Sequence, residues 1–142
     1  YILITDKTDK INKIIMKKKD IFLIKAFHLA NLMLIIFYLF PGSIFGHFLY
    51  NNTSIQPQIT RDFLISSNHF YVFIILSTIG ILAYRNNKKI NFLINYLFLL
   101  SIILELFHII IPNRGFQFSD LFGNIMGVIV VVIVYKIKKK YE

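Results

Sequence analysis

The stretch ELFHIIIPNRGFQFSDLFGNIMG, residues 105–127, places ionisable and amide side chains between two long apolar runs. Glu105 lies inside the first of these runs, where a charge would have to leave water. Because a charged side chain within a membrane segment is costly, Glu105 is a candidate functional residue. We expect Arg114 or Asp120 to be its partner.

The composition of the whole chain indicates a membrane protein. Of the 142 residues, 56% are hydrophobic and 16% are charged, and the mean hydropathy is +0.65. The apolar runs approach the roughly 20 residues that a helix needs to cross a bilayer. We therefore predict an all-α, polytopic protein of the cell membrane, with the lipid bilayer as its surroundings.

Charge and cysteine content exclude several classes of function. The formal net charge is +9, but the lysines cluster just outside the apolar runs, as in the cytoplasmic segments of membrane proteins, so we expect no nucleic-acid partner. The chain has no cysteine, which excludes disulfides, thiol nucleophiles and cysteine-based metal centres. Any metal would need His and carboxylate ligands.

Four apolar segments are long enough to form transmembrane helices. Proline cannot continue a helix, so Pro41 should end the first helix and Pro112 the third. Ser119 is the expected N-cap of the fourth helix, with Asp120 in its first turn. A loop with a turn around residues 44–49 should separate the first two spans. The predicted spans are Ile21–Phe40, about His69–Tyr84, Ile90–Ile111 and Ser119–Tyr135.

The segments outside these spans are basic. Residues 1–20 form a lysine-rich lead-in, residues 21–135 the predicted membrane domain, and residues 136–142 a basic tail. Met16 opens the sequence Met-Lys-Lys-Lys-Asp. We therefore also consider that translation starts at Met16 and that the residues before it are an upstream extension.

The distribution of Lys and Arg predicts the orientation of the chain. The lead-in, the turn at residues 85–89 and the tail are basic, whereas the other two loops carry one Arg each, so both termini should be cytoplasmic. This topology places the polar residues of three helices at the outer leaflet. At 1.5 Å per residue, Glu105 lies roughly 10 Å below Pro112, and Asn124 roughly 6 Å below Asp120. The polar set can therefore form one outer pocket.

Helical periodicity predicts the inward faces of the last two helices. Glu105 and His108 share an arc of roughly 140° with the other polar residues of the third helix. In the fourth helix, Gly123 and Gly127 have the small-x-x-x-small spacing that lets two helices approach closely, with Asn124 on the same face. We interpret both glycines as helix-packing residues.

His28 and Asn31 lie on one side of the first predicted helix. Polar side chains in such positions commonly hydrogen-bond across helices. We interpret both residues in that way, with a catalytic role as the alternative.

The spacing of the polar residues resembles a known family. The pattern is His69-Phe70, Glu105-x-x-His108, Pro112-x-Arg114 and Asp120-x-x-x-Asn124-x-x-Gly127. It is similar to that of the VanZ-like family of small bacterial membrane proteins, over roughly residues 65–135. His108 stands where that family has Gln. The resemblance implies a four-helix membrane protein of the cell envelope, and it implies low-level resistance to the glycopeptide teicoplanin.

Three functions are compatible with these residues. The first is an envelope factor whose outer-leaflet pocket engages a lipid-linked cell-wall precursor or a lipoglycopeptide. Arg114 could pair with a phosphate of such a ligand, or instead bridge Glu105 and Asp120. The candidate ligand-binding residues are Arg114, His108 and Asn124.

The second function is an enzyme that acts on a lipid-linked substrate by acid–base chemistry. Burial raises the pKa of a carboxyl group, so Glu105 could act as general acid or base with a histidine as proton partner. The candidate catalytic residues are Glu105, Asp120 and His69. Metal ligation by these residues and His108 is a variant, but one Glu-x-x-His is only part of a di-metal bundle site, so we expect no metal cofactor.

The third function is a small structural subunit of a membrane complex.

Overall fold

The chain folds as a bundle of helices. The computed structural model describes residues 2–62 and 64–141, with side chains from Lys18 onward. These residues form helices and no strand; the helices are α1 (Ile2–Leu39), α2 (Ile44–Tyr50), α3 (Ser67–Tyr84), α4 (Ile90–Phe107) and α5 (Phe118–Tyr141). Four of them, all but α2, are long and apolar enough to cross a membrane. The predicted all-α class with four transmembrane helices is confirmed.

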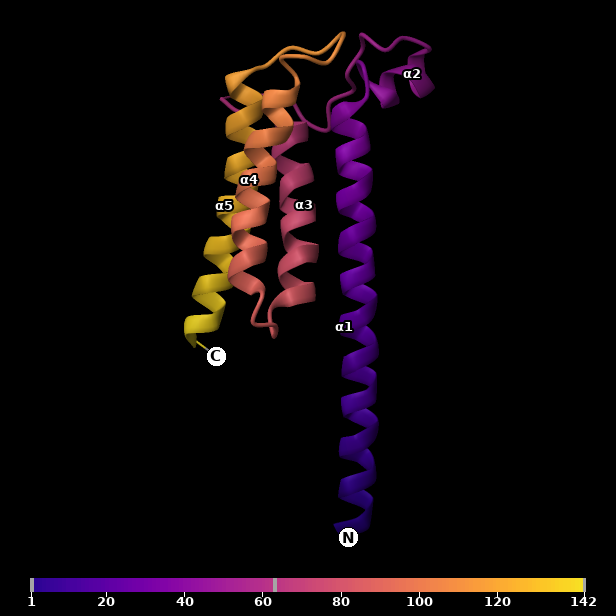
Figure 1. Cartoon of the computed structure of the whole chain (residues 1–142), viewed down its shortest axis with the longest axis vertical. Coiled ribbons are helices and arrows are strands. Elements are labelled where there is room, and N and C mark those ends of the chain that lie inside the picture. Colours follow the sequence, from indigo (N-terminus) through magenta and orange to yellow (C-terminus); the bar gives the residue numbers. More distant parts are fainter. Residues whose placement is uncertain (1, 63, 142) are drawn as a thin grey trace.

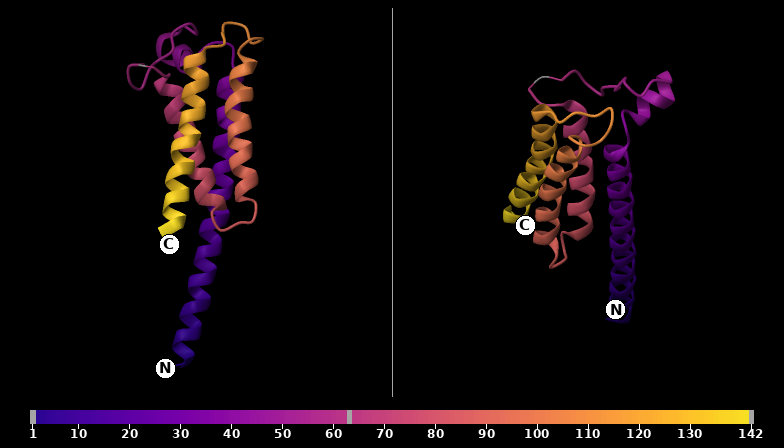
Figure 2. Two further views of the ribbon diagram at one scale, coloured as in Figure 1. Left: turned by 90° about the vertical axis from the view of Figure 1, so that its left-hand side faces the viewer. Right: turned by 45° about the horizontal axis from the view of Figure 1, so that its top comes forward.

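Helix α3 holds the bundle together, because it packs against α1, α4 and α5. The start of α1 and the end of α5 lie at the same end of the bundle, together with the 85–89 turn (Figure 1). The loops around α2 and the 108–117 turn lie at the other end, as the two turned views in Figure 2 also show. This arrangement fits the predicted topology, in which the basic end faces the cytoplasm.

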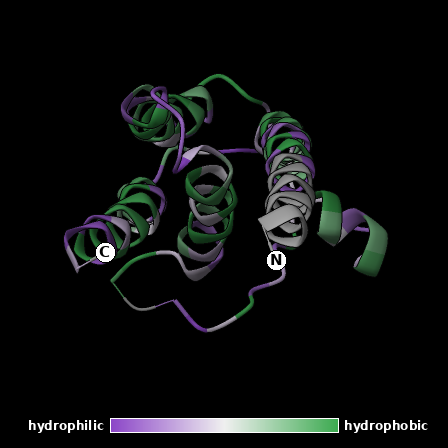
Figure 3. Ribbon diagram, turned by 90° about the horizontal axis from the view of Figure 1, so that it is seen from below, coloured by the Kyte–Doolittle hydropathy of each residue, from purple (hydrophilic) through white to green (hydrophobic). Residues whose placement is uncertain are grey.

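The core is small and the outer surface is apolar. Phe73, Leu97 and Val128 are fully buried where the helices meet. Large apolar side chains are exposed on all four long helices, for example Phe22, Leu99 and Ile133, and hydrophobic stretches are visible on α3, α4 and α5 in Figure 3. Exposed apolar surface of this extent is typical of a protein whose surroundings are lipid.

The ends of α1 and α4 are both followed by proline. Helix α1 ends at Leu39, because Phe40 precedes Pro41 and the residue before proline is disfavoured in helix. The prediction that the third span continues to Ile111 is wrong, since α4 ends at Phe107. From His108 onward the chain tightens into hydrogen bonds between residues three apart, such as His108 N–H to Glu105 C=O at 3.1 Å. This turn points the His108 side chain into the bundle.

Helix α5 also differs from its prediction. It begins at Phe118 and continues to Tyr141, because lysines are good helix formers and favour a helix C-terminus. Ser119 therefore lies within the helix and is not its N-cap. Its hydroxyl lies 3.3 Å from the Asp120 carboxylate.

The loop between α1 and α3 contains the short helix α2, close to the predicted turn. The Ser43 hydroxyl accepts a hydrogen bond from Gly46 N–H at 2.9 Å, which caps the start of α2. Asn51 ends it in the left-handed conformation. The large side chains at the end of α2 are exposed, and Phe48 is 80% exposed.

Candidate functional site

Four helices bring polar side chains together at the end of the bundle opposite the termini. Helix α1 contributes Tyr38, the first turn of α3 His69, the end of α4 Glu105, and the first turns of α5 Asp120 and Asn124. His108 follows α4 directly. Four of the polar residues are buried with at most 5% of their surface exposed: His69, Glu105, His108 and Asn124.

Glu105 lies at the centre of this group and is fully buried. Its Oε1 accepts a hydrogen bond from Gln117 N–H at 3.1 Å. Its Oε2 lies 3.3 Å from Nδ1 of His108 and 3.7 Å from Nδ1 of His69. Within the described residues Oε2 makes no hydrogen bond of good geometry. A buried carboxylate oxygen between two imidazoles is a place where a proton can be held or exchanged.

The ring of His69 lies between the two carboxylates. Its Nε2 is 3.4 Å from Asp120 Oδ2, while its Nδ1 faces Glu105. Nδ1 also lies 3.0 Å from the Tyr38 hydroxyl and 3.2 Å from Asn124 Oδ1. His69 thus connects Glu105 to Asp120.

Tyr38 is the site residue that the sequence did not single out. Its hydroxyl donates a 2.6 Å hydrogen bond to Asn124 Oδ1, and its carbonyl oxygen lies 3.2 Å from His108 Nε2. A carbonyl only accepts, so Nε2 of His108 carries a proton. The Tyr38 ring also stacks on His108, with centroids 5.5 Å apart. The only sequence signal was a hydroxyl in the last turn before Pro41, in a chain with many aromatic residues.

Arg114 does not bridge the carboxylates. Its Nη2 donates to the Phe37 carbonyl at 3.1 Å and its Nε to the Phe40 carbonyl at 3.3 Å. These carbonyls belong to the end of α1, where backbone oxygens lack partners within the helix. Of the two expected partners of Glu105, Arg114 bonds to α1 instead, because the turn after α4 carries it there, and Asp120 is connected to Glu105 through His69. Burial lowers the pKa of Arg114, but a guanidinium titrates so high that it stays charged.

Two glycines fix the distance between α3 and α5, and Asn124 ties α5 to α4. Asn124 is fully buried and donates to the Ser101 carbonyl at 3.2 Å. A Cβ added at Gly123 would lie 2.8 Å from the Ser66 carbonyl oxygen, and one at Gly127 would lie 2.6 Å from the Phe70 carbonyl oxygen. The absence of side chains lets the two backbones touch at the level of His69.

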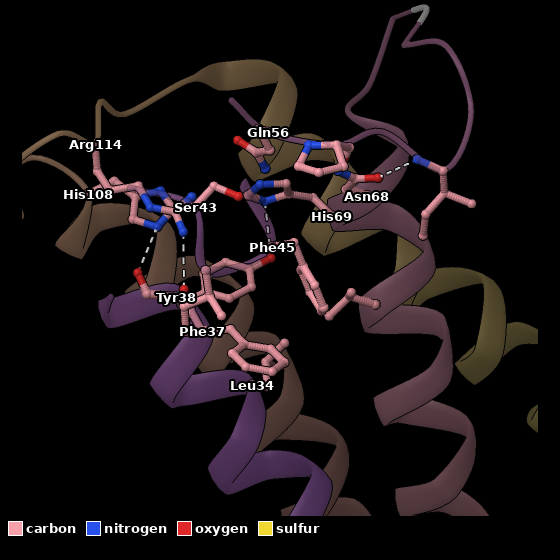
Figure 4. A pocket seen from close by; sticks show the side chains of 14 residues that line it. Leu34, Phe37, Tyr38, Ser43, Phe45, Gln56, Asn68, His69, His108 and Arg114 are labelled. Carbon is pink, nitrogen blue, oxygen red and sulfur yellow. Dashed lines mark hydrogen bonds between the residues drawn. The ribbon is translucent and has the colours of Figure 1, made fainter. Parts of the chain in front are cut away.

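A pocket of about 180 Å³ adjoins this cluster (Figure 4). Its walls are mainly apolar and come from α1, α2, the loop before α3, and α3, with Leu34, Phe37 and Phe45 among them. The side chains of His69, His108 and Arg114 line it as well. Glu105 and Asp120 do not line the pocket but contact the histidines that do.

Three of these side chains could hold a metal ion. One donor atom each from His69, Glu105 and Asp120 lie within 4.8 Å of one another. The triad thus has the His and carboxylate donors that a cysteine-free site needs. His69 directs one ring nitrogen towards each carboxylate, so both carboxylates help to fix the orientation of its ring.

The structure also places His28 and Asn31, away from this cluster. His28 Nε2 lies 3.2 Å from the Tyr84 hydroxyl, and the Asn31 amide donates to the Tyr96 hydroxyl at 2.6 Å. Both contacts cross between helices, in agreement with the packing interpretation.

No protein-family model, curated protein or solved structure matches the chain. The VanZ-like resemblance therefore stays a prediction, carried by the spacing of its motif residues.

Proposed function

We propose that the chain is a VanZ-like envelope protein of the bacterial cell membrane that binds the polar head of a lipid-linked cell-wall precursor or a lipoglycopeptide. The observation that carries the proposal is the pocket itself. It joins an apolar wall to two imidazoles and a guanidinium, which suits an amphipathic molecule with an anionic group.

The chemistry of the lining groups supports an anionic head. The guanidinium of Arg114 has further N–H donors beyond its two bonds to α1, and such donors pair well with phosphate. His69 and His108 line the pocket, and the Glu105 and Asp120 carboxylates, 3.3–3.4 Å from their ring nitrogens, orient the two imidazole rings. The carboxylates would thus act on the ligand through the histidines.

The surroundings of the pocket support a ligand that arrives from the membrane. Ile44 and Phe45 of α2 line the pocket, while Phe48, Leu49 and Tyr50 of the same helix are 57–80% exposed. A short helix with such a face belongs in the membrane interface. The proposed ligand would therefore reach the pocket from the outer leaflet, beneath α2.

The first experiment measures teicoplanin and vancomycin susceptibility of a sensitive Gram-positive host that expresses the chain. We expect the wild type to protect against teicoplanin and Glu105→Gln to lose that protection at equal membrane levels, because a neutral amide replaces the charged oxygen that lies between His69 and His108 and orients their rings. Asp20→Asn, which removes a carboxylate near the other end of the bundle, is the matched control and should protect like the wild type. Equal susceptibility with and without the wild-type protein would refute the resistance function.

A second candidate is an enzyme that acts on a lipid-linked cell-wall or glycan substrate. The observation that favours it is the connection Glu105–His69–Asp120, in which an imidazole between two carboxylates could move a proton. Purified protein would be incubated with isolated lipid-linked precursors, and the products followed by mass spectrometry. Substrate consumption that Glu105→Gln abolishes in a folded protein would favour the enzyme, whereas ligand retention without product would favour binding.

A third candidate, a structural subunit of a larger membrane complex, predicts a different outcome. Burial of Glu105 and Asn124 between helices is also what a purely structural polar cluster would show. In that case Glu105→Gln should lower the amount of folded protein or release a co-purifying partner. A stable but inactive Glu105→Gln protein argues against this role.

A further inference from the structure

A second and larger groove lies at the opposite end of the bundle, between α3 and α5. It has a volume of about 600 Å³. Aliphatic side chains form its walls, among them Ile74 and Leu82 of α3 and Val130 and Val134 of α5. The groove is remote from Glu105, so the function proposed above does not depend on it.

The groove arises from the way the two helices cross. Gly123 and Gly127 bring α5 into contact with the start of α3. Beyond Gly127, helix α5 has no further glycine and presents Val131, Val134 and Tyr135 on this side. The helices therefore separate towards the C-terminal end, where α5 leans away from α3 in Figure 1. An apolar space opens in the leaflet on the basic side.

Cationic and polar groups surround this groove at the basic end of the bundle. Arg85 follows α3, and Lys138 and Lys139 lie in the last turns of α5. Among the described residues that line the groove there is no carboxylate. The buried hydroxyl of Tyr135 has no hydrogen-bond partner within the described part of the chain, and Lys139 Nζ lies 6.0 Å from the centre of its ring. The groove thus offers an unused donor beside positive charges from two helices.

We propose that this groove binds one phospholipid with an anionic headgroup, from the leaflet at the basic end of the bundle. The acyl chains would lie along the Ile and Val side chains. The phosphate would lie between Arg85 and Lys139, within reach of the Tyr135 hydroxyl. Basic pockets between transmembrane helices bind acidic lipid heads in this way. A zwitterionic lipid fits less well, because no carboxylate is present to pair with its ammonium group.

The test uses the absence of Trp from the chain. In a Val134→Trp variant the single Trp lies in the groove, so brominated lipids that enter it quench the fluorescence. The protein is placed in phosphatidylcholine vesicles that contain equal mole fractions of brominated phosphatidylglycerol or brominated phosphatidylcholine. We expect brominated phosphatidylglycerol to reach the same quenching at a lower mole fraction than brominated phosphatidylcholine. The mole fraction should be lower by about fivefold for each cation that contacts the headgroup.

Two double variants separate a built site from a generally basic surface. Arg85→Gln with Lys139→Gln should abolish the preference for phosphatidylglycerol. Lys88→Gln with Lys140→Gln removes the same amount of charge from the same end of the bundle, but outside the groove. This variant should retain the preference for phosphatidylglycerol. Equal quenching by both lipids in the reporter variant would overturn the proposal. Equal loss in both double variants would also overturn it, because only the surface charge would then matter. Native mass spectrometry of the chain without the reporter checks that wild type also retains phosphatidylglycerol.

Discussion

At the scale of single residues, the Tyr38 hydroxyl connects α1 to the buried cluster. It donates to Asn124 at 2.6 Å and lies 3.0 Å from His69. Tyr38→Phe leaves the ring in place but removes the donor, so buried acceptors lose their partner. We expect the free energy of unfolding to fall by about 1–2 kcal/mol, measured by reversible denaturation in detergent micelles.

Tyr135→Phe is the matched control for that substitution. The Tyr135 hydroxyl is buried but makes no hydrogen bond within the described residues. Its removal in detergent should leave stability unchanged or raise it slightly, because no partner is lost. If the free energy of unfolding fell equally in both variants, the Tyr38 hydrogen bonds would not be what attaches α1 to the bundle.

The residue scale also shows what the sequence could not predict. The spacing of Glu105, His108 and Asp120 predicted that they converge, because helical rise and topology place them at one depth. The partner of Arg114 could not be predicted, since it depends on how the turn after α4 folds across the end of α1. Tyr38 was missed because its signal, one hydroxyl, is shared by other aromatic residues of the chain.

At the scale of elements, the number of long helices followed from apolar length, whereas the short helix α2 and the helix ends did not. Proline placed the end of α1 within one residue. Helix α4 stopped four residues before the predicted Ile111, because the chain had already tightened at His108. Helix α5 passed the lysines that were expected to end it, since a basic segment limits the membrane span without breaking a helix.

The close contact of α3 with α5 should depend on Gly127. A Cβ at this position would lie 2.6 Å from the Phe70 carbonyl oxygen and 2.8 Å from Phe73 Cβ, and neither can move without shifting α3. We expect Gly127→Leu to destabilise the fold by about 3 kcal/mol or more, seen as a lower midpoint of thermal unfolding in detergent.

Gly115→Ala is the control for this substitution, because a Cβ there meets nothing within 4 Å. It should unfold at the wild-type temperature. A wild-type midpoint for Gly127→Leu would mean that α3 and α5 do not pack as closely as the structure has them.

At the scale of the whole molecule, α1 is the most loosely held of the four spans. In its most apolar stretch of 18 residues only 17% are buried, against 44% in the corresponding stretch of α3. Polar contacts at two levels attach it to the bundle: Tyr38 and Arg114 at the site, and His28 and Asn31 in the middle of the span. Lipid offers no hydrophobic force between helices, so such contacts and packing carry the association. The pocket, which lies against the end of α1, depends on that attachment.

The orientation of this bundle decides which leaflet the site can reach. Gly115 lies in the exposed turn at the site end, and Lys88 in the turn at the basic end. Because the chain has no cysteine, a single Gly115→Cys or Lys88→Cys substitution reports one side of the membrane. We expect a membrane-impermeant maleimide to label Gly115→Cys in intact cells and Lys88→Cys only after lysis, since the basic turn should be cytoplasmic. The opposite pattern would place the pocket at the inner leaflet, where neither a lipoglycopeptide nor an exported wall precursor could reach it. Such a result would refute the proposed envelope function together with the predicted orientation.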